Sequence, residues 1–187
     1  MRIISGSARG TELVLPKTDL RPTMDLVRGA IFSSLGDWVA GARVLDLFSG
    51  TGSLGIEALS RGAASAILVE SNRKACEAIT QNLRKTRLQA TVVQSDVFAY
   101  LKTRAQPAQA NLIFADPPYS KERESRDYAA ELLAFQGLQT VLAPEGLLVL
   151  EVVCGWKLPE TSPWECLRQK RYGSTETLLL RARPPQD

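Results

Sequence analysis

One short run constrains the fold of this chain more than any other feature. Asp46-Leu-Phe-Ser-Gly50-Thr-Gly52-Ser-Leu-Gly55 lies between an apolar stretch of strand length and an amphipathic stretch of helix length. Its glycines have the G-x-G-x-x-G spacing, in the strand–turn–helix setting in which that spacing has a physical meaning. Glycine allows a tight turn and a close approach of the backbone to a ligand. The run therefore predicts an α/β fold that binds a nucleotide-type ligand at the end of a central strand.

The rest of the chain alternates strand and helix patterns in the way such a fold requires. Nearly all of the predicted strands are apolar, which is typical of a sheet covered by helices on both faces, and helical crossovers imply parallel strands. The last two strands form a hairpin around Gly173 and predict an antiparallel edge. The expected strands are 43–48, 66–70, 90–94, 111–115, 147–152, 165–172 and 175–183, and the expected helices are 53–61, 71–85, 97–104 and 127–142.

The first 40 residues stand apart from this alternation. Residues 2–5 and 11–15 predict a β-hairpin with its turn at 6–10, and Thr23 is a plausible N-cap for a helix that follows. A piece of this size is too small to fold alone. We therefore expect residues 1–40 to be an extension that packs on one domain spanning 41–187.

Composition excludes several kinds of chemistry. The 187 residues include no histidine, so neither a serine triad with histidine nor a histidine-ligated metal is available. The three cysteines have no C-x-x-C spacing, and we expect no metal site. The net charge of +3 permits an anionic partner without requiring one. No apolar run has the length of a membrane span or of a signal peptide, so we expect a cytoplasmic protein.

Asp46 points to the kind of ligand that the glycine run binds. A carboxylate just before the glycines is unfavourable for a pyrophosphate but suits the cationic amino-acid end of S-adenosylmethionine. Glu70 ends the second predicted strand, where an acid can bind ribose hydroxyls, and Asp96 follows the third, where it can accept from an adenine amine beside an apolar residue. The residues expected to bind this cofactor are Asp46, Phe48, Ser49, Gly50, Gly52, Glu70, Ser71, Asp96 and Val97.

Asp116-Pro117-Pro118-Tyr119, directly after the fourth predicted strand, predicts the reaction. The prolines fix the backbone, so carbonyl groups and the Asp116 carboxylate can accept from an NH₂ group while Tyr119 stacks on a flipped base. An exocyclic amine is a poor nucleophile because its lone pair is delocalised into the ring. Two acceptors that hold its hydrogens favour a pyramidal nitrogen aimed at the methyl group. We expect these four residues to be catalytic.

Together these motifs resemble the RsmD family, the bacterial 16S ribosomal RNA guanine-N2 methyltransferases. The resemblance covers nearly the whole chain, and the D-P-P-Y motif alone is shared with DNA adenine methyltransferases. Ser174 departs from the family, since many relatives have an acid there. The segments that single out this family are Arg2-Ile-Ile-Ser-Gly with Arg9-Gly10, Arg21-Pro22-Thr23 with Arg28, Gly62-Ala63, and Lys170-Arg171-Tyr172-Gly173.

The resemblance implies an α/β fold of the Rossmann-like class I methyltransferase type, a mainly parallel seven-stranded sheet with an antiparallel edge strand. It also implies a guanine of 16S ribosomal RNA as the acceptor, within the small ribosomal subunit or an assembly intermediate. We expect a monomer that meets RNA phosphate through Arg9, Arg21, Arg28 and Arg171. Residues 41–187 are then the methyltransferase domain.

The residues themselves leave alternatives open. A DNA adenine-N6 or other nucleic-acid amino-methyltransferase shares both central motifs, although no stretch here is long enough for a separate target-recognition region. An NAD-dependent oxidoreductase explains the glycine run but leaves Asp116-Pro-Pro-Tyr119 without a role. A non-catalytic RNA-binding module has no use for both motifs together, and a protein-glutamine methyltransferase is expected to carry Asn in place of Asp116.

Overall fold

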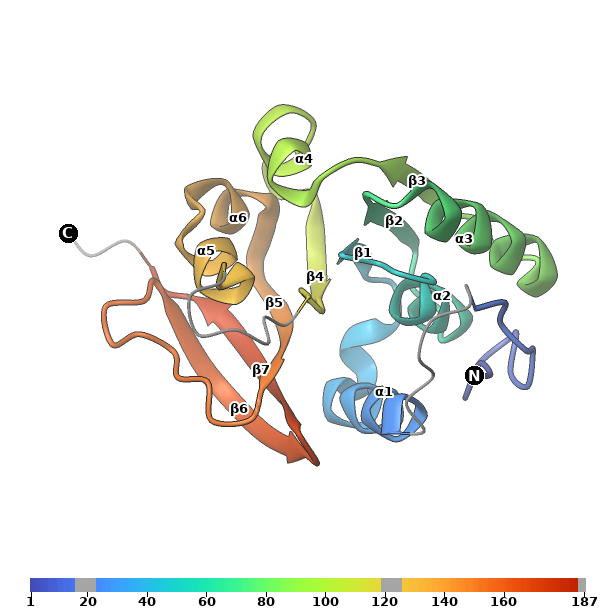
Figure 1. Ribbon diagram of the computed structural model, residues 1–187, viewed down its shortest axis with the longest axis horizontal. Helices are drawn as coiled ribbons and strands as arrows, with labels where there is room; N and C mark the ends of the chain where they lie inside the picture. Colours follow the sequence, from blue (N-terminus) through green and yellow to red (C-terminus); the bar gives the residue numbers. More distant parts are fainter. Residues whose placement is uncertain (16–22, 119–125, 185–187) are drawn as a thin grey trace.

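A computed structural model describes residues 1–15, 23–118 and 126–184. A seven-stranded sheet of order β3-β2-β1-β4-β5-β7-β6 runs through the middle of the molecule (Figure 1). The strands are β1 (Arg43–Leu47), β2 (Ser65–Glu70), β3 (Thr91–Gln94), β4 (Ala110–Ala115), β5 (Leu142–Val153), β6 (Trp164–Tyr172) and β7 (Thr175–Ala182). The helices are α1 (Thr23–Leu35), the 3-10 helix η1 (Gly36–Val39), α2 (Ser53–Ser60), α3 (Arg73–Thr86), α4 (Val97–Thr103), α5 (Tyr128–Ala134) and α6 (Gln136–Val141).

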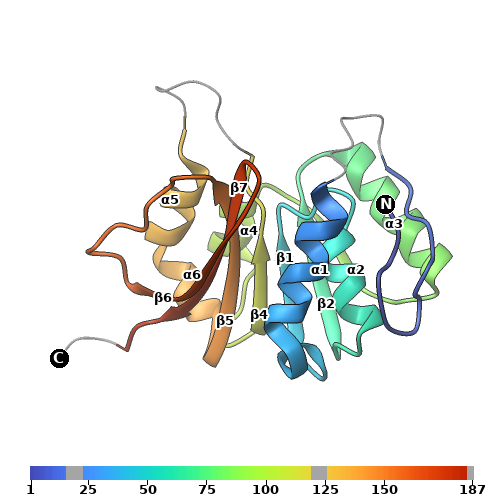
Figure 2. The ribbon, with the colours of Figure 1, turned by 90° about the horizontal axis from the view of Figure 1, so that it is seen from below.

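The predicted fold class is confirmed. The first five strands pair in parallel, in the order β3-β2-β1-β4-β5. β7 lies between β5 and β6 and is antiparallel to both. β1 pairs with both β2 and β4, so the order of winding reverses between β1 and β4 (Figure 2). In open α/β sheets the crevice at such a switch point, at the carboxyl ends of the strands, is where ligands bind.

Helices cover both faces of the sheet, and alternate strand residues feed two separate cores. On one face, Val44 and Phe114 pack with residues of α1, α2 and α3. On the other face, Leu45 and Leu47 pack with residues of α4, α5 and α6. This alternation means that a strand residue's position decides which layer it faces. Asp46 and Phe114 are register partners, so Asp46 faces the layer of α1 and α2.

The N-terminal segment pairs as a shorter hairpin than predicted. Arg2 and Glu12 form a single antiparallel bridge, and no strand extends from it. Backbone bonds from the Ile3 N–H to the Thr11 carbonyl at 3.0 Å and from the Leu13 N–H to the Met1 carbonyl at 3.1 Å flank this bridge, and two buried side chains of the main domain bind the outward-facing backbone groups of the same segment. Glu57 accepts from the backbone of Ile4 at 2.7 Å. Asn82 accepts from the N–H of Val14 at 2.6 Å and donates to its carbonyl at 3.0 Å.

Two predicted boundaries are also wrong. The helix expected over 127–142 is two helices, broken at Phe135, whose ψ of 109° is extended. The break lets the Phe135 ring pack on Phe98, with centroids 6.0 Å apart, and under Gly137, where a Cβ would lie 2.7 Å from the ring. β5 begins at Leu142, earlier than predicted, because pairing with β4 continues across a register shift.

Two negative findings hold for the described residues. No helix among them has the length and apolar character needed to cross a bilayer. Nor do three Cys, Asp or Glu side chains of these ranges gather as a metal ion would need.

Candidate active site

The glycine loop between β1 and α2 has the strained backbone that its sequence predicts. Gly50 and Gly52 have φ values of +54° and +75°, and Phe48, which has a side chain, is held at +58°. A Cβ on Gly52 would lie 2.8 Å from Leu68 Cδ2, so this glycine allows the loop to pack on β2. A Cβ on Gly50 would have no heavy atom within 4 Å. The backbone at Gly50 therefore borders open space, where a ligand can approach it closely.

Ser49 and Asp46 fix the loop from beneath. Ser49 Oγ donates to the Asp46 carbonyl at 2.6 Å, and the Asp46 carboxylate accepts from the Gly55 N–H at 2.9 Å. Asp46 is only 2% exposed, and this burial raises its pKa to about 7, while the Gly55 N–H acts in the opposite direction. A carboxylate with this pKa changes its charge near neutral pH, and a nearby cation would favour the ionised form.

Glu70 joins the end of β2 to the glycine loop. Its carboxylate accepts from the N–H of Gly50 at 2.8 Å and from the N–H of Asn72 at 2.7 Å. The hydroxyl of Ser71, which is exposed, donates to the same carboxylate at 3.4 Å. Gly50, Glu70 and Ser71 thus form one polar edge beside the open space at Gly50. Acceptors and backbone N–H groups in this position fit the hydroxyl groups of a ribose.

The third strand's end has a capping carboxylate with aromatic rings nearby. Asp96 caps α4 by accepting from the Ala99 N–H at 3.0 Å, and Val97 is buried in the core. Phe98 lies next to Tyr128, with centroids 6.4 Å apart, and the Arg126 guanidinium lies 4.9 Å above its ring. The sequence analysis assigned neither ring to the site. Phe98 stands only two residues after Asp96, whereas Tyr128 comes to α4 from α5 and has no local signal.

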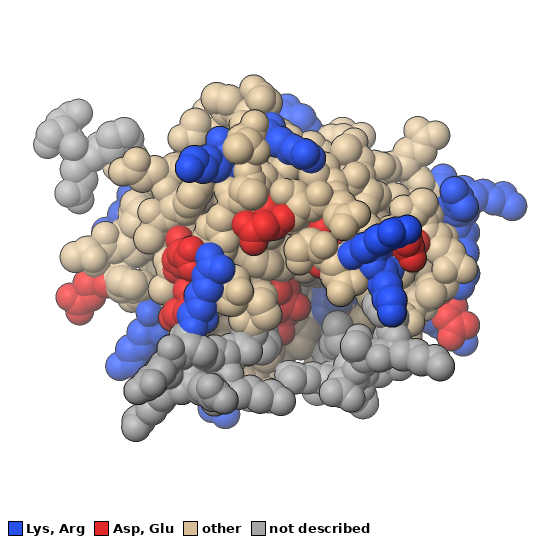
Figure 3. All heavy atoms as spheres, turned by 45° about the horizontal axis from the view of Figure 1, so that its top comes forward, with Lys and Arg blue, Asp and Glu red and all other residues tan. Residues whose placement is uncertain are grey.

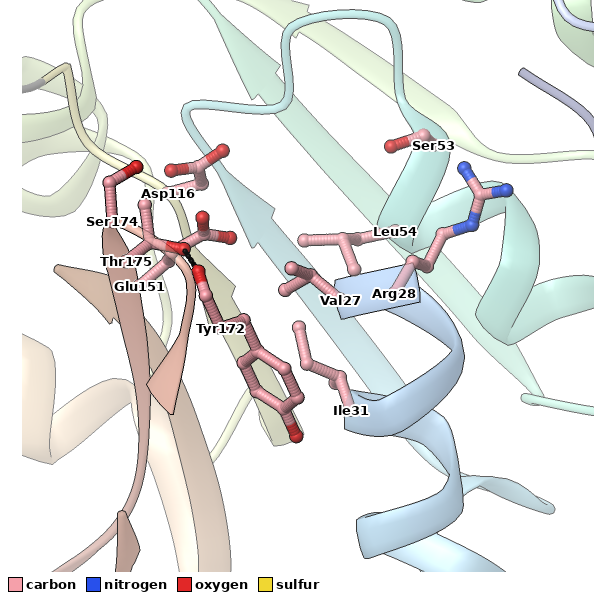
Figure 4. Close-up of a pocket in the computed structure, with 10 residues that line it drawn as sticks. All are labelled: Val27, Arg28, Ile31, Ser53, Leu54, Asp116, Glu151, Tyr172, Ser174 and Thr175. Atoms are coloured by element: carbon pink, nitrogen blue, oxygen red, sulfur yellow. Dashed lines mark hydrogen bonds between the residues drawn. The ribbon is translucent and has the colours of Figure 1, made fainter. Parts of the chain in front are cut away.

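Asp116 follows β4 and lines a cleft on the α1 side of the sheet (Figure 4). The cleft is open to solvent, and polar side chains of Ser53, Glu151 and Ser174 line it together with Asp116. Pro117 is buried and Pro118 is exposed, whereas Tyr119 lies outside the described residues. Because β4 is the neighbour of β1, Asp116 stands at the switch point, between the end of β1 and this cleft.

Several residues of the cleft were not predicted. Glu151 comes from the carboxyl-terminal part of β5, and Tyr172, Ser174 and Thr175 come from the turn between β6 and β7. The hydroxyl of Thr175 donates to the Tyr172 carbonyl at 3.3 Å, which closes this turn. Glu151 had a signal in the sequence, since it is a carboxylate near the end of an otherwise apolar strand. The turn had only the family resemblance of Tyr172 and Gly173.

The predicted RNA-contacting arginines fall into different environments. Arg9 and Arg171 are exposed, and Arg21 lies outside the described residues. Arg28 departs from the expectation of an exposed side chain, since it is 2% exposed and forms a salt bridge with Asp25 at 3.0 Å. It lies 3.7 Å from the buried carboxylate of Glu57, and desolvation lowers its pKa against the opposing effect of the two acids.

Arg28 therefore forms part of the packing between α1 and α2. It also lines the wall of the cleft (Figure 4). Figure 3 shows that one face of the molecule carries blue Lys and Arg side chains in separate groups around acidic ones, with no continuous basic patch. A small net charge distributed in this way favours contacts at separate points over a single binding stripe.

Comparison with known proteins places this geometry in a family. A family model described as conserved hypothetical protein 95 matches residues 1–181. Ribosomal RNA small subunit methyltransferase D of Escherichia coli (strain K12) is 36% identical over 176 residues, 92% of this chain and 85% of that protein. YlbH of Bacillus subtilis (strain 168) is 36% identical over 188 residues, 98% of this chain and 100% of that protein.

Solved structures share the same architecture. The structure of yhhF from Escherichia coli has a TM-score of 0.82 and 35% identity, with 98% of each chain covered. SMU.776, a structure complexed with SAH, has a TM-score of 0.66 at 17% identity, over 86% of this chain and 50% of that one. At 17% identity, the likeness to SMU.776 shows the fold alone. With the sheet order given above, these structures show the class I S-adenosylmethionine methyltransferase fold.

Proposed function

The chain belongs to the family described as conserved hypothetical protein 95, and on that premise we propose that it methylates the exocyclic N2 amine of a guanine in 16S ribosomal RNA. It is an S-adenosylmethionine-dependent methyltransferase related to ribosomal RNA methyltransferases. One observation carries the finer proposal. Asp116, the acid of the D-P-P-Y motif, lies at the switch point and lines an open cleft with apolar and aromatic walls.

The residues around the glycine loop fit S-adenosylmethionine. The open space at Gly50 leaves room for a ligand, Glu70 offers acceptors to the ribose hydroxyls, and the ionisable Asp46 favours the cationic amino-acid end. We propose that Asp96 and the neighbouring Phe98 ring hold the adenine. When bound, S-adenosylmethionine supplies an electrophilic methyl carbon attached to a positively charged sulfur.

The acceptor side needs groups that hold an amine rather than a strong base. The N2 amine donates hydrogen bonds to the Asp116 carboxylate and to backbone carbonyls at Pro117. This favours a pyramidal nitrogen and directs its lone pair. Transfer forms the N2–C bond, breaks the C–S bond with its electron pair going to sulfur, and releases one N2 proton, for which Asp116 is a nearby acceptor.

The substrate is proposed to be a small ribosomal subunit or an assembly intermediate. We propose that the cleft at Asp116 binds one flipped base, but the methyltransferase core occupies most of the 187 residues and leaves little surface to recognise a long sequence. Structured RNA is generally recognised by shape, so the choice of one guanine depends on its surroundings. The relative in Escherichia coli carries the small subunit in its name.

The test is transfer of tritiated methyl groups from S-adenosylmethionine to small subunits and to protein-free 16S RNA, both from cells that lack the modification. We expect labelled N2-methylguanosine after nuclease digestion, with faster transfer to the subunit. Label in N6-methyladenosine would refute the base, and no label in either RNA substrate would refute the substrate class. Equal rates on subunits and on free RNA would refute the assembled substrate while leaving the guanine in place.

A further inference from the structure

We propose that Glu151 selects guanine at this site by accepting a hydrogen bond from its ring N1–H, beside the amine that Asp116 holds. This inference rests on the proposed function and adds to it a residue that decides which base is accepted. Neither the glycine loop nor the D-P-P-Y motif distinguishes guanine from adenine, because both bases carry an exocyclic amine. A specificity residue must therefore lie elsewhere in the cleft.

The sheet places Glu151 next to Asp116. β4 and β5 are parallel and hydrogen-bonded, with Ala115 paired to Leu150, so Asp116 and Glu151 are the next residues along the two strands. Ala115 and Leu150 face the α4–α6 core, and side chains alternate along a strand. Asp116 and Glu151 therefore both face the α1 side. Figure 4 shows their carboxylates beside each other in the same cleft.

The other walls of the cleft fit a flat ring. Val27 and Ile31 of α1 and Leu54 of α2 lie across from the carboxylates, and Tyr172 adds an aromatic side chain next to Ile31 (Figure 4). Apolar and aromatic walls stabilise a heteroaromatic ring through its faces. The ring's polar edge is then left to the side of the cleft that carries Asp116 and Glu151.

A carboxylate at this place suits guanine and no other standard base with an exocyclic amine. In guanine the ring nitrogen N1, next to the amine, carries a proton, so two donors stand side by side. In adenine and cytosine the corresponding ring nitrogen, N1 or N3, carries a lone pair and accepts. An ionised carboxylate only accepts, so it pairs with guanine N1–H and repels the lone pair of the other two bases. Two adjacent carboxylates thus match two adjacent donors.

The test compares guanine with 2-aminopurine at the target position of reconstituted small subunits. 2-Aminopurine keeps the N2 amine that receives the methyl group, but its N1 is an acceptor. We expect the wild-type enzyme to prefer guanine by about tenfold to hundredfold in kcat/KM. In Glu151→Gln the amide can donate to the 2-aminopurine N1, so transfer to guanine falls and the preference shrinks at least about tenfold. Donor affinity, measured by calorimetry, stays unchanged.

Glu165→Gln is the matched control. Glu165 is an exposed carboxylate of β6 that pairs with Arg181 at 3.0 Å, and it should leave the preference unchanged. A Glu151→Gln enzyme that keeps the wild-type preference, or loses both substrates in equal proportion with donor binding intact, would overturn the role of Glu151 while the proposed function stands. A wild-type enzyme that labels no guanine N2 at all would instead overturn the proposed function, and this inference with it.

Discussion

Between Asp46 and Val97, one stretch of chain supplies every residue predicted to bind the donor, whereas the acceptor cleft is lined by segments as distant as Val27 and Thr175. The donor side is built largely from backbone held by Asp46 and Glu70, which accept from N–H groups of the loop. The acceptor side is built from side chains of two helices, two strands and a hairpin turn. Changes on the donor side should therefore alter donor binding, and changes on the acceptor side should alter turnover and base choice.

Asp116→Ala should have the largest effect, and it should separate turnover from donor affinity most clearly. Loss of a group that stabilises the transition state typically costs about 10²–10³ in kcat. Because Asp116 lines the cleft and not the open space at Gly50, donor affinity should change less than about twofold. Single-turnover methyl transfer and calorimetry give the two values. Asp37, an exposed carboxylate of η1, provides the control Asp37→Ala, which should leave both unchanged. A matching loss of donor affinity in Asp116→Ala would contradict the division.

Alanine substitutions at the two glycines of the donor loop should have different effects on folding and on donor binding. Gly52→Ala combines a positive φ with a Cβ 2.8 Å from Leu68, so it should destabilise folding by about 2–5 kcal/mol. Gly50→Ala meets no atom, so its folding cost is the backbone strain alone, about 1–3 kcal/mol. Its Cβ enters the open space, however, and donor affinity should fall. Urea unfolding and calorimetry separate these effects, and equal destabilisation by both alanines would show that packing on Leu68 is unimportant.

This contrast also explains what the sequence predicts. The glycine run and the alternating strand and helix patterns are local, and the structure follows most of them closely. Glu57 and Asn82, by contrast, look like ordinary helix residues, yet they are buried and bind the backbone of the N-terminal segment to the main domain. Arg28 is buried for the same reason. Such pairings depend on tertiary contacts between residues far apart in the chain, which no local period or spacing encodes.

Glu70→Ala tests the donor side by removing a side chain that both holds the glycine loop and faces the proposed ribose site. The carboxylate binds the Gly50 N–H, and we propose that it also binds the ribose, so its loss should weaken donor affinity by about 1–3 kcal/mol. The turnover of donor-saturated enzyme should change little. Glu77→Ala removes an exposed carboxylate of α3 that pairs with Arg73, and it serves as the control. Unchanged affinity in Glu70→Ala would remove this residue from the site.

Asp46 should make donor binding depend on pH. Its pKa is raised from 3.8 to about 7, chiefly by burial, so a cationic donor that requires the ionised form must displace a proton below that pH. Affinity should weaken by up to about tenfold per pH unit below 7 and level off above it, and Asp46→Asn should lack this component. In the donor-free protein, the protonated form stabilises the fold at low pH, and that contribution is lost as pH rises from 4 to 7. Calorimetry from pH 5.5 to 8.5 on both proteins measures the difference.

The smallest expected effect concerns RNA phosphate. Arg171 precedes Tyr172, the residue of β6 that lines the acceptor cleft. Its exposed guanidinium donates to the Gly173 carbonyl at 3.1 Å through Nε, which leaves other N–H groups available. If one phosphate pairs with it, Arg171→Ala should lower the slope of log affinity against log salt by about one and weaken binding a few-fold. Arg104 is also exposed and is the C-cap residue of α4, which covers the face of the sheet opposite α1 and the cleft, so Arg104→Ala should leave the slope unchanged. Filter binding of small subunits at several salt concentrations measures both slopes.

Because a phosphate contact positions RNA without selecting a base, Arg171→Ala should also keep the full preference for guanine over 2-aminopurine. A variant that lost that preference would show that the β6–β7 hairpin recognises the base itself. RNA positioning and base selection would then have to be assigned to different residues within the acceptor side.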